Sequence, residues 1–234
     1  MFEEKLRRLS TPVDIIILPE MFSTGFSMQP EKLAEPMSGF AVEWMQRMSV
    51  ALNAVITGSL IIEDNGAYFN RLIWAQPDGE LYWYNKRHLF SMAGEEKVYF
   101  PGSDKLVVEW KGWKICPMIC YDLRFPVWIR NVENYDLLLF VANWPDRRIQ
   151  HWRKLLQARA IENQCYVVGV NRVGDDGNGI SHSGNSMFIN PQGEIQLELI
   201  EQDTIAIANL DYDEITKTRR YMPFLSDRDN FKFL

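Results

Sequence analysis

Short apolar runs bounded by turn-forming residues recur along the whole chain and constrain its fold more than any other feature. Val13–Leu18 is nearly all apolar, as expected for a strand covered on both faces. Other runs flank Pro77-Asp78-Gly79, Lys111-Gly112 and Pro191-Gln192-Gly193, where proline's fixed φ and glycine's freedom favour hairpin turns. The predicted strands are Val13–Leu18, Ala54–Ile62, Phe69–Gln76, Leu81–Lys86, Leu106–Trp110, Trp113–Ile119, Leu137–Asn143, Tyr166–Asn171, Met187–Asn190, Glu194–Leu199 and Thr204–Leu210.

Helical spacing appears between these runs. Apolar residues recur at every fourth position from Phe40 to Leu52, which places them on one face of a helix. Gln150–Asn163 repeats this pattern, and shorter helices are expected at Pro126–Val132 and Asp213–Arg220, which begin at proline or an acidic residue. This order is typical of a layered α/β protein with a mixed sheet. No linker divides residues 1–234, so we expect a single domain.

Composition and charge exclude several classes of protein. The chain is 47% hydrophobic and 24% charged, which argues against disorder and fibrous repeats. Its 25 basic and 31 acidic residues give a net charge of −6, which argues against nucleic acid as a main partner. The longest clean apolar run, Leu137–Ala142, is too short to span a membrane. MFEEKLRRLS lacks an apolar signal segment and the chain has only three cysteines, so we expect a reduced, cytoplasmic location.

Three predicted strands lead into a residue that can take part in catalysis, namely Glu20, Lys86 and Cys120. Binding crevices form at the carboxyl ends of strands in open α/β sheets. There a carboxylate can accept the thiol proton, and an ammonium can stabilise both the thiolate and a substrate oxyanion. Taken singly, each residue has a simpler explanation, as a small buried side chain for the cysteine and as surface charges for the other two.

Other kinds of site find less support in the sequence. Cys116 precedes Cys120 by four residues, but no second cysteine–histidine pair follows at zinc spacing, so no metal site is expected. The histidines lie far apart in the sequence, and only His88 is near a candidate, two residues from Lys86. No nucleophile elbow, phosphate loop or dinucleotide fingerprint occurs. The three strand ends therefore remain the main candidate site.

The strings LPEMFSTGF, YNKRHLF and ICYDLRFP resemble the three active-site signatures of the nitrilase superfamily, the carbon–nitrogen hydrolases. Glu20, Lys86 and Cys120 stand 66 and 34 residues apart, intervals that also match that family. The resemblance runs to about Asp211. It implies a four-layer α-β-β-α sandwich with mixed sheets, no cofactor, and a triad in which Glu20 is the general base, Lys86 the oxyanion stabiliser and Cys120 the nucleophile.

The resemblance also implies a second glutamate between the lysine and the cysteine. SMAGEEKVYFPG contains Glu95 and Glu96, and Glu95 fits the family spacing better, although either residue is otherwise explained as a solvated loop charge. The backbone N–H of Tyr121, directly after the nucleophile, is the expected second oxyanion donor.

Within the family, CYDLRFP and the later NWPDRR and LLQARAIENQ strings resemble the omega-amidase branch. Its members hydrolyse the terminal amide of 2-oxo acids such as 2-oxoglutaramate and 2-oxosuccinamate. Arg124 is expected to bind the substrate carboxylate through a bidentate fork, or else to form a structural salt bridge with Asp122 or another neighbouring residue. Trp144 and Phe26 are expected to wall the pocket, or else to pack in the core.

Two further expectations follow from the resemblance. The family implies a homodimer acting on a small-molecule amide. Members usually open with a strand and a long helix before the LPE strand, and here MFEEKLRRLS looks like only the end of that helix, so one strand and part of one helix are expected to be missing. The alternatives are an N-carbamoyl amino acid or aliphatic amide hydrolase with the same triad, and a catalytically silent binding or scaffold protein.

Overall fold

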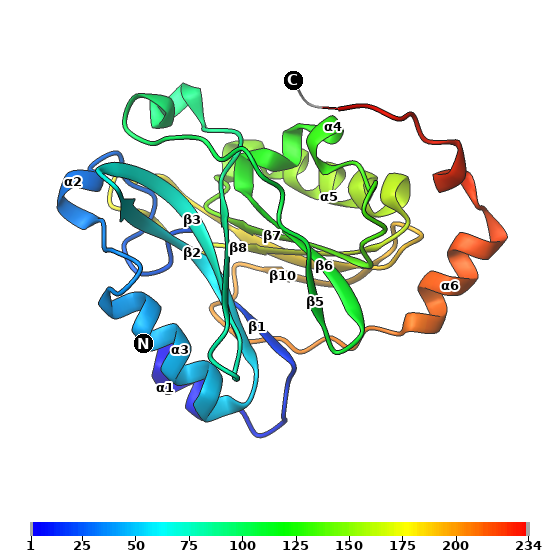
Figure 1. Cartoon of the computed structure of the whole chain (residues 1–234), viewed down its shortest axis with the longest axis horizontal. Coiled ribbons are helices and arrows are strands. Elements are labelled where there is room, and N and C mark those ends of the chain that lie inside the picture. Colours follow the sequence, from blue (N-terminus) through cyan, green and yellow to red (C-terminus); the bar gives the residue numbers. More distant parts are fainter. Residues whose placement is uncertain (1, 233–234) are drawn as a thin grey trace.

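The computed structural model describes residues 2–232, whose strands form two sheets (Figure 1). The first sheet has the order β1-β2-β3-β4 and the second has the order β10-β9-β8-β7-β6-β5. In the first, β1 and β2 are parallel and the other pairs are antiparallel. In the second, β6, β7 and β8 run parallel. The strands are β1 (Ile15–Ile17), β2 (Val55–Asp64), β3 (Ala67–Ala75), β4 (Leu81–Asn85), β5 (Val108–Trp110), β6 (Trp113–Ile119), β7 (Leu137–Ala142), β8 (Tyr166–Asn171), β9 (Gly184–Ile189) and β10 (Ile195–Ile200).

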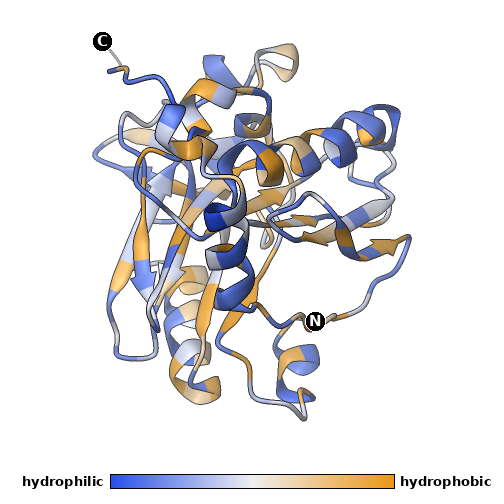
Figure 2. Cartoon of the chain, turned by 90° about the vertical axis from the view of Figure 1, so that its right-hand side faces the viewer, coloured by the Kyte–Doolittle hydropathy of each residue, from blue (hydrophilic) through white to orange (hydrophobic). Residues whose placement is uncertain are grey.

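Helices cover the outer faces of the two sheets, so that the layers run α-β-β-α (Figure 1). On the first sheet, Trp44, Met45 and Met48 of α3 pack against the apolar residues of β2 and β3. Figure 2 shows hydrophobic residues gathered along the strands between more hydrophilic helices and loops. The helices are α1 (Phe2–Arg7), α2 (Pro30–Leu33), α3 (Phe40–Leu52), α4 (Pro126–Ile129), α5 (Ile149–Asn163) and α6 (Tyr212–Tyr221), and the short 3-10 turns are η1 (Ser91–Ala93), η2 (Glu95–Lys97), η3 (Cys120–Arg124), η4 (Asp146–Arg148) and η5 (Phe224–Asp227).

One glycine sets the close approach of α5 to the second sheet. A Cβ on Gly169 of β8 would lie 2.6 Å from Leu156 Cδ1 and 2.7 Å from Trp152 Cζ2. Both side chains are fully buried, so they have little room to move, and any larger residue at this position would push the helix outward.

The structure confirms the three predicted hairpins and shortens other elements. The turns at Pro77-Asp78-Gly79, Lys111-Gly112 and Pro191-Gln192-Gly193 each join two antiparallel strands. The predicted helix from Pro126 ends at Ile129. The mixed sheets predicted from the order of elements are present in both halves of the sandwich.

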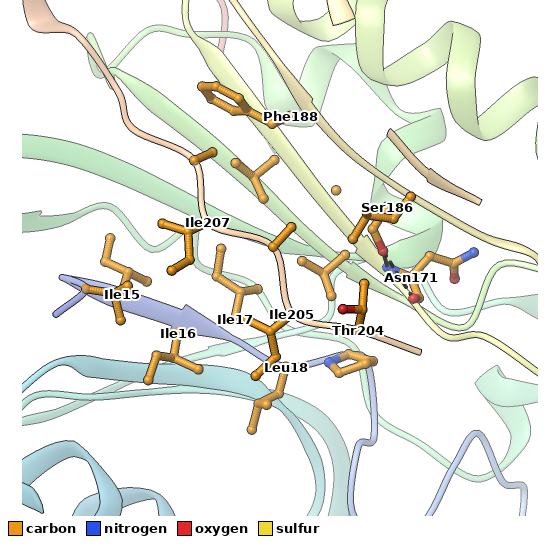
Figure 3. A pocket seen from close by; sticks show the side chains of 18 of the residues that line it. Ile15, Ile16, Ile17, Leu18, Asn171, Ser186, Phe188, Thr204, Ile205 and Ile207 are labelled. Atoms are coloured by element: carbon orange, nitrogen blue, oxygen red, sulfur yellow. Dashed lines mark hydrogen bonds between the residues drawn. The ribbon is translucent and has the colours of Figure 1, made fainter. Parts of the chain in front are cut away.

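The prediction of a strand at Thr204–Leu210 is wrong. This segment has no assigned strand, and within residues 2–232 the backbone of 202–210 makes no hydrogen bond. A cavity of about 1010 Å³ separates it from β1, and Figure 3 shows the side chains of Ile15, Ile17, Ile205 and Ile207 in this cavity. We call this cavity, between β1 and residues 201–210, the β1 groove. An apolar run forms a strand only when another strand edge pairs with it, and here the groove lies between the two edges.

The parallel arrangement brings several strand ends to one place. β4 runs in the same direction as β1, because each is separated from the other by one parallel and two antiparallel pairings. The carboxyl ends of β1 and β4 therefore lie at the same edge of the first sheet, where they lead into Glu20 and Lys86. Within the described residues, no helix is both long enough and apolar enough to cross a membrane.

Candidate active site

Glu20 is buried and held through both carboxylate oxygens. Its Oε1 accepts hydrogen bonds from Lys86 Nζ at 2.9 Å and from Asn70 Nδ2 at 2.8 Å. Its Oε2 accepts one from the backbone N–H of Asn143 at 2.8 Å, and the Asn143 side chain returns a bond to the Glu20 carbonyl at 2.7 Å. The carboxylate therefore has one orientation, set from β3, β4 and the end of β7.

Lys86 lies between two carboxylates. Its Nζ is 2.9 Å from Glu20 Oε1 and 2.9 Å from Glu95 Oε2, and all three side chains are buried from solvent. Burial alone would lower the pKa of Lys86, but the charges of Glu20 and Glu95 outweigh it and raise that pKa. The lysine is therefore an ammonium near pH 7.

Glu95 is the second carboxylate, and it reaches the site from a 3-10 turn. Burial raises its pKa, the ammonium of Lys86 opposes this effect, and the charge of Glu20 adds to it. Its Oε2 also accepts a hydrogen bond from the backbone N–H of Phe90 at 2.5 Å. Glu96, the alternative candidate, is exposed, so the structure brings only Glu95 to Lys86.

Asn70 of β3 joins the two carboxylates. Its Nδ2 donates to Glu20 Oε1 at 2.8 Å and to Glu95 Oε1 at 3.1 Å, while its Oδ1 is buried without a partner among the described residues. An amide NH₂ has two donors, and both are used to hold two like charges near each other. We call Glu20, Asn70, Lys86 and Glu95 the carboxylate–lysine cluster.

Cys120 stands at a sharp turn directly after β6. It begins the 3-10 turn η3 and has a φ of +43°, a left-handed conformation that costs of order 1–3 kcal/mol in a residue with a Cβ. Burial, and then the charge of Glu20, raise the pKa of the Cys120 thiol well above its ordinary value, with Lys86 acting in the opposite direction. The thiol is therefore neutral near pH 7 and needs a base before it can attack.

Asp122 pins this turn to β4. Its Oδ2 accepts hydrogen bonds from the backbone N–H of Ile119 at 3.1 Å and from Tyr84 Oη at 2.8 Å. Its Oδ1 accepts one from the backbone N–H of His88 at 3.0 Å and lies 2.8 Å from His88 Nδ1. Because Lys86 lies between Tyr84 and His88 in the chain, the same carboxylate ties the cysteine turn to the lysine segment.

The cluster and Cys120 open into a pocket of about 340 Å³. Phe26 lies over the lysine, with 5.5 Å from Lys86 Nζ to its ring centroid. Tyr121, Arg124 and Trp144 also line the pocket. Every residue that the sequence named as a site candidate, apart from the exposed Glu96, therefore lies in or beside this pocket.

Arg124 does not form a salt bridge with Asp122, and its neighbours are His151 and Trp144. Its two terminal nitrogens lie 3.3 Å from His151 Nδ1, and its Cζ stands 4.6 Å from the ring centroid of Trp144. Asp122, the alternative partner, is occupied by Tyr84 and His88. Trp144 belongs to the hydrophobic core and also lines the pocket. It is buried among the apolar residues of the second sheet, and its ring faces Arg124.

Comparison with known proteins assigns the family. Residues 2–220 match the family described as carbon-nitrogen hydrolase. The chain belongs to the carbon-nitrogen hydrolases. It is thus a hydrolase that acts on carbon–nitrogen bonds, with the nitrilase-type sandwich that its sequence signatures predict.

Individual relatives of this carbon-nitrogen hydrolase are similar along nearly the whole chain. The omega-amidase YafV of Yersinia enterocolitica is 47% identical over 222 residues, which cover 94% of this chain and 86% of that protein. The 2-oxoglutaramate amidase of Bacillus subtilis is 31% identical and covers 95% and 87% respectively. The crystal structure of XC1258 from Xanthomonas campestris, a superfamily protein with an arsenic adduct in its active site, has a TM-score of 0.96 at 44% identity, covering 99% of this chain and 91% of that one.

Sequence reasoning missed Asn70 and Asn143 of this carbon-nitrogen hydrolase. Asn70 stands in the middle of an apolar strand, and a polar residue at such a position is a usable signal, because a buried amide needs partners. Asn143 ends the β7 run, as Glu20, Lys86 and Cys120 end theirs, so the strand-end rule could have included it. Within residues 2–232, no group of three or more His, Cys, Asp or Glu side chains is arranged to hold a metal ion.

Proposed function

We propose that this hydrolase is an amidase that converts the terminal amide of a small 2-oxo acid amide, such as 2-oxoglutaramate or 2-oxosuccinamate, into the acid and ammonia through a thioester on Cys120. The observation that carries the proposal is the meeting of Glu20, Lys86 and Glu95 beside a neutral thiol at the base of a small pocket. The names of the similar omega-amidase and 2-oxoglutaramate amidase support the substrate class.

The first step forms the bond from Cys120 Sγ to the amide carbon. Because burial and the charge of Glu20 hold the thiol protonated, the proton passes to the Glu20 carboxylate as sulfur attacks. The amide oxygen takes the displaced electron pair. Lys86 and the backbone N–H of Tyr121 hold this oxyanion, since N–H groups at the start of a helical turn have no partner within the turn.

The second step breaks the carbon–nitrogen bond and releases ammonia. Glu20 returns the proton to the leaving nitrogen, and the oxyanion electrons reform the carbonyl as a thioester. A water then loses a proton to Glu20 and attacks the thioester carbon. Collapse of that intermediate expels sulfur, which takes the proton back from Glu20, and the carboxylic acid leaves.

Asn70 and Asn143 have a positioning role in this scheme. Their hydrogen bonds hold Glu20 in the same orientation for four proton transfers, so little reorganisation is required at each one. Glu95 keeps Lys86 charged and aligned between the two carboxylates. Each oxyanion donor in such a site contributes roughly 3–4 kcal/mol to the lowering of the barrier.

At the far end of the pocket, Arg124 binds the substrate carboxylate. Its guanidinium has no carboxylate partner within the described residues, and a planar fork matches the two oxygens of a carboxylate. Phe26 and Trp144 enclose the carbon chain between the two ends. A pocket of about 340 Å³ is at the small end of ligand sites, which suits a short dicarboxylic acid monoamide.

An ammonia-release assay with the purified chain tests this function. The substrates are 2-oxoglutaramate, glutamine, an N-carbamoyl amino acid and a nitrile, and we expect 2-oxoglutaramate to give the highest kcat/KM. Release from the carbamoyl compound alone would replace the proposal with the N-carbamoyl hydrolase alternative. No release from any substrate would favour a silent binding protein. The homodimer stays a prediction, which sedimentation of the same sample tests.

A further inference from the structure

A second arginine, Arg148, shares the pocket with Arg124. It ends the 3-10 turn η4, directly before α5. Neither guanidinium has a carboxylate within salt-bridge distance among the described residues. Asp122 pairs with His88, and Asp176, which also lines the pocket, accepts hydrogen bonds from the backbone N–H groups of Asn178 and Ile180. Arg147, the third arginine of this pocket, is exposed. Arg124 and Arg148 are half-buried, and half-buried cations without a carboxylate partner among the described residues require an explanation from what the pocket binds.

Aromatic rings hold both arginines in place. Arg124 Cζ lies 4.6 Å from the ring centroid of Trp144, and Arg148 Cζ lies 5.1 Å from that of Phe90. Trp144 Nε1 also donates a hydrogen bond to the carbonyl of Arg148 at 2.9 Å, so the backbone of one arginine is fixed by the ring that stacks on the other. Rings orient a guanidinium without neutralising its charge, and the donors at its edge stay available.

The positive charges of the arginines in this pocket repel one another. Burial, and then the charges of Arg147 and Arg124, lower the pKa of Arg148. Like charges in one pocket repel, and that repulsion falls when an anion binds between them.

A 2-oxo acid has more oxygen acceptors than one guanidinium fork can bind. A single fork takes the two carboxylate oxygens, and the adjacent 2-oxo oxygen then needs its own donor. We propose, building on the proposed function, that Arg148 donates to the 2-oxo oxygen while Arg124 binds the carboxylate, so that Arg148 selects 2-oxo acid amides over simple dicarboxylic acid monoamides. A site that is built to hydrogen-bond a substrate oxygen rejects analogues that lack it.

The test uses three five-carbon amides that differ only at the far end. 2-Oxoglutaramate has both the 2-oxo group and the carboxylate, glutaramate lacks the 2-oxo group, and pentanamide lacks both. Arg148→Gln is expected to raise KM about tenfold for 2-oxoglutaramate and less than about twofold for the other two. Arg124→Gln is expected to raise KM for both acids and not for pentanamide.

Arg220→Gln is the control, because it removes the same charge from an exposed position of α6 that does not line the pocket. A rise in KM of less than about twofold for all three amides is expected from this variant, since exposed charges are screened. If Arg148→Gln raised KM equally for 2-oxoglutaramate and glutaramate, the assignment of the 2-oxo oxygen would be wrong, while turnover by the wild type would still support the amidase. If the wild type turned over none of the three, the proposed function itself would fail.

Discussion

The carboxylate–lysine cluster and the β1 groove lie in the same sandwich and follow opposite rules. In the cluster, both oxygens of each carboxylate accept hydrogen bonds, and Lys86 Nζ is shared between Glu20 and Glu95. In the groove, apolar side chains face open space and the backbone of 202–210 makes no hydrogen bond within the described residues. Many hydrogen bonds fix the side chains of the cluster, whereas the two segments on either side of the groove do not pair with each other.

The difference shows where this fold has stability to lose. Buried charges are tolerated only when each is paired and hydrogen-bonded. Removing one member of the cluster therefore leaves the other charges buried without a partner, and their desolvation cost is no longer offset. Ile205 and Ile207 are already 42% and 46% exposed, so changing them removes little buried surface. The effects of substitutions on stability and activity should therefore differ between the two regions in size and in pH dependence. The following four predictions test this difference.

The largest expected effect follows from removing Cys120, the proposed nucleophile. Cys120→Ala should lower kcat by at least about a thousandfold, as loss of a nucleophile does in other hydrolases, because no other thiol reaches the pocket. Cys116 and Cys165 are both buried and cannot substitute for it. The melting temperature should change little, since the small side chain keeps the turn, and activity measured alongside thermal unfolding checks both expectations. Retained turnover in a folded variant would reject Cys120 as the nucleophile.

The next effect concerns Lys86 and stability. Lys86→Met leaves Glu20 and Glu95 as unpaired buried charges, which should cost about 3–5 kcal/mol of unfolding free energy at pH 8. The pKa of Glu95 is already raised by burial and by Glu20, and the variant removes the ammonium that opposes this. The folded state then binds more protons than the unfolded state above the ordinary glutamate pKa, so stability should rise as pH falls from 8 toward 5.

Urea unfolding at pH 8 and at pH 5 measures this change. The wild type should vary less over the same range, because Lys86 has a raised pKa and its contribution is lost only at strongly alkaline pH. Lys105→Met is the matched control: it removes an ion pair with Glu133, whose carboxylate is one-third exposed, so it should cost about 1 kcal/mol or less without the same gain at pH 5. Equal pH responses in both variants would contradict the buried-charge explanation.

A smaller effect is expected at Asn70. Asn70→Ala should lower kcat about 10- to 100-fold with little change in KM, because Glu20 loses one of the donors that orient it. Asn70→Asp adds a third carboxylate, so the acid limb of the pH–rate profile should also move to higher pH. Asn190→Ala, which removes a buried asparagine that bonds Glu194 and Glu214 far from the pocket, should affect stability and leave kcat unchanged. A similar loss of kcat in both alanine variants would show that Asn70 acts only through stability.

Much of this architecture could be predicted because its signals are local. Proline and glycine mark the three hairpin turns, and each strand that leads into Glu20, Lys86 or Cys120 is a mostly apolar run. The resemblance to known signatures added the roles of these residues. Parallel strands place their carboxyl ends at one edge of a sheet, which brings Glu20 and Lys86 together in the first sheet. Asp122 ties the Cys120 turn of the second sheet to the lysine segment.

The rest depends on partners that are distant in sequence. Asn70 looks like an ordinary polar residue until Glu20 and Glu95, which are 50 and 25 residues away, are seen beside it. Asp122 likewise owes its role to Tyr84, in a strand of the other sheet, and to His88, which follows that strand. Thr204–Leu210 has the composition of a strand, but strand pairing is a property of two segments, and composition describes only one of them.

The smallest effects on stability are expected in the β1 groove. Ile205→Ser should lower the unfolding free energy by less than about 1 kcal/mol, whereas Leu139→Ala, at a fully buried position, should cost about 2–5 kcal/mol. In hydrogen exchange, the amides of 204–210 should exchange far faster than those of β2, because they lack acceptors. Slow exchange at 204–210 in the 234-residue chain would show that these amides are already bonded in solution, and the contrast between the two regions would then disappear.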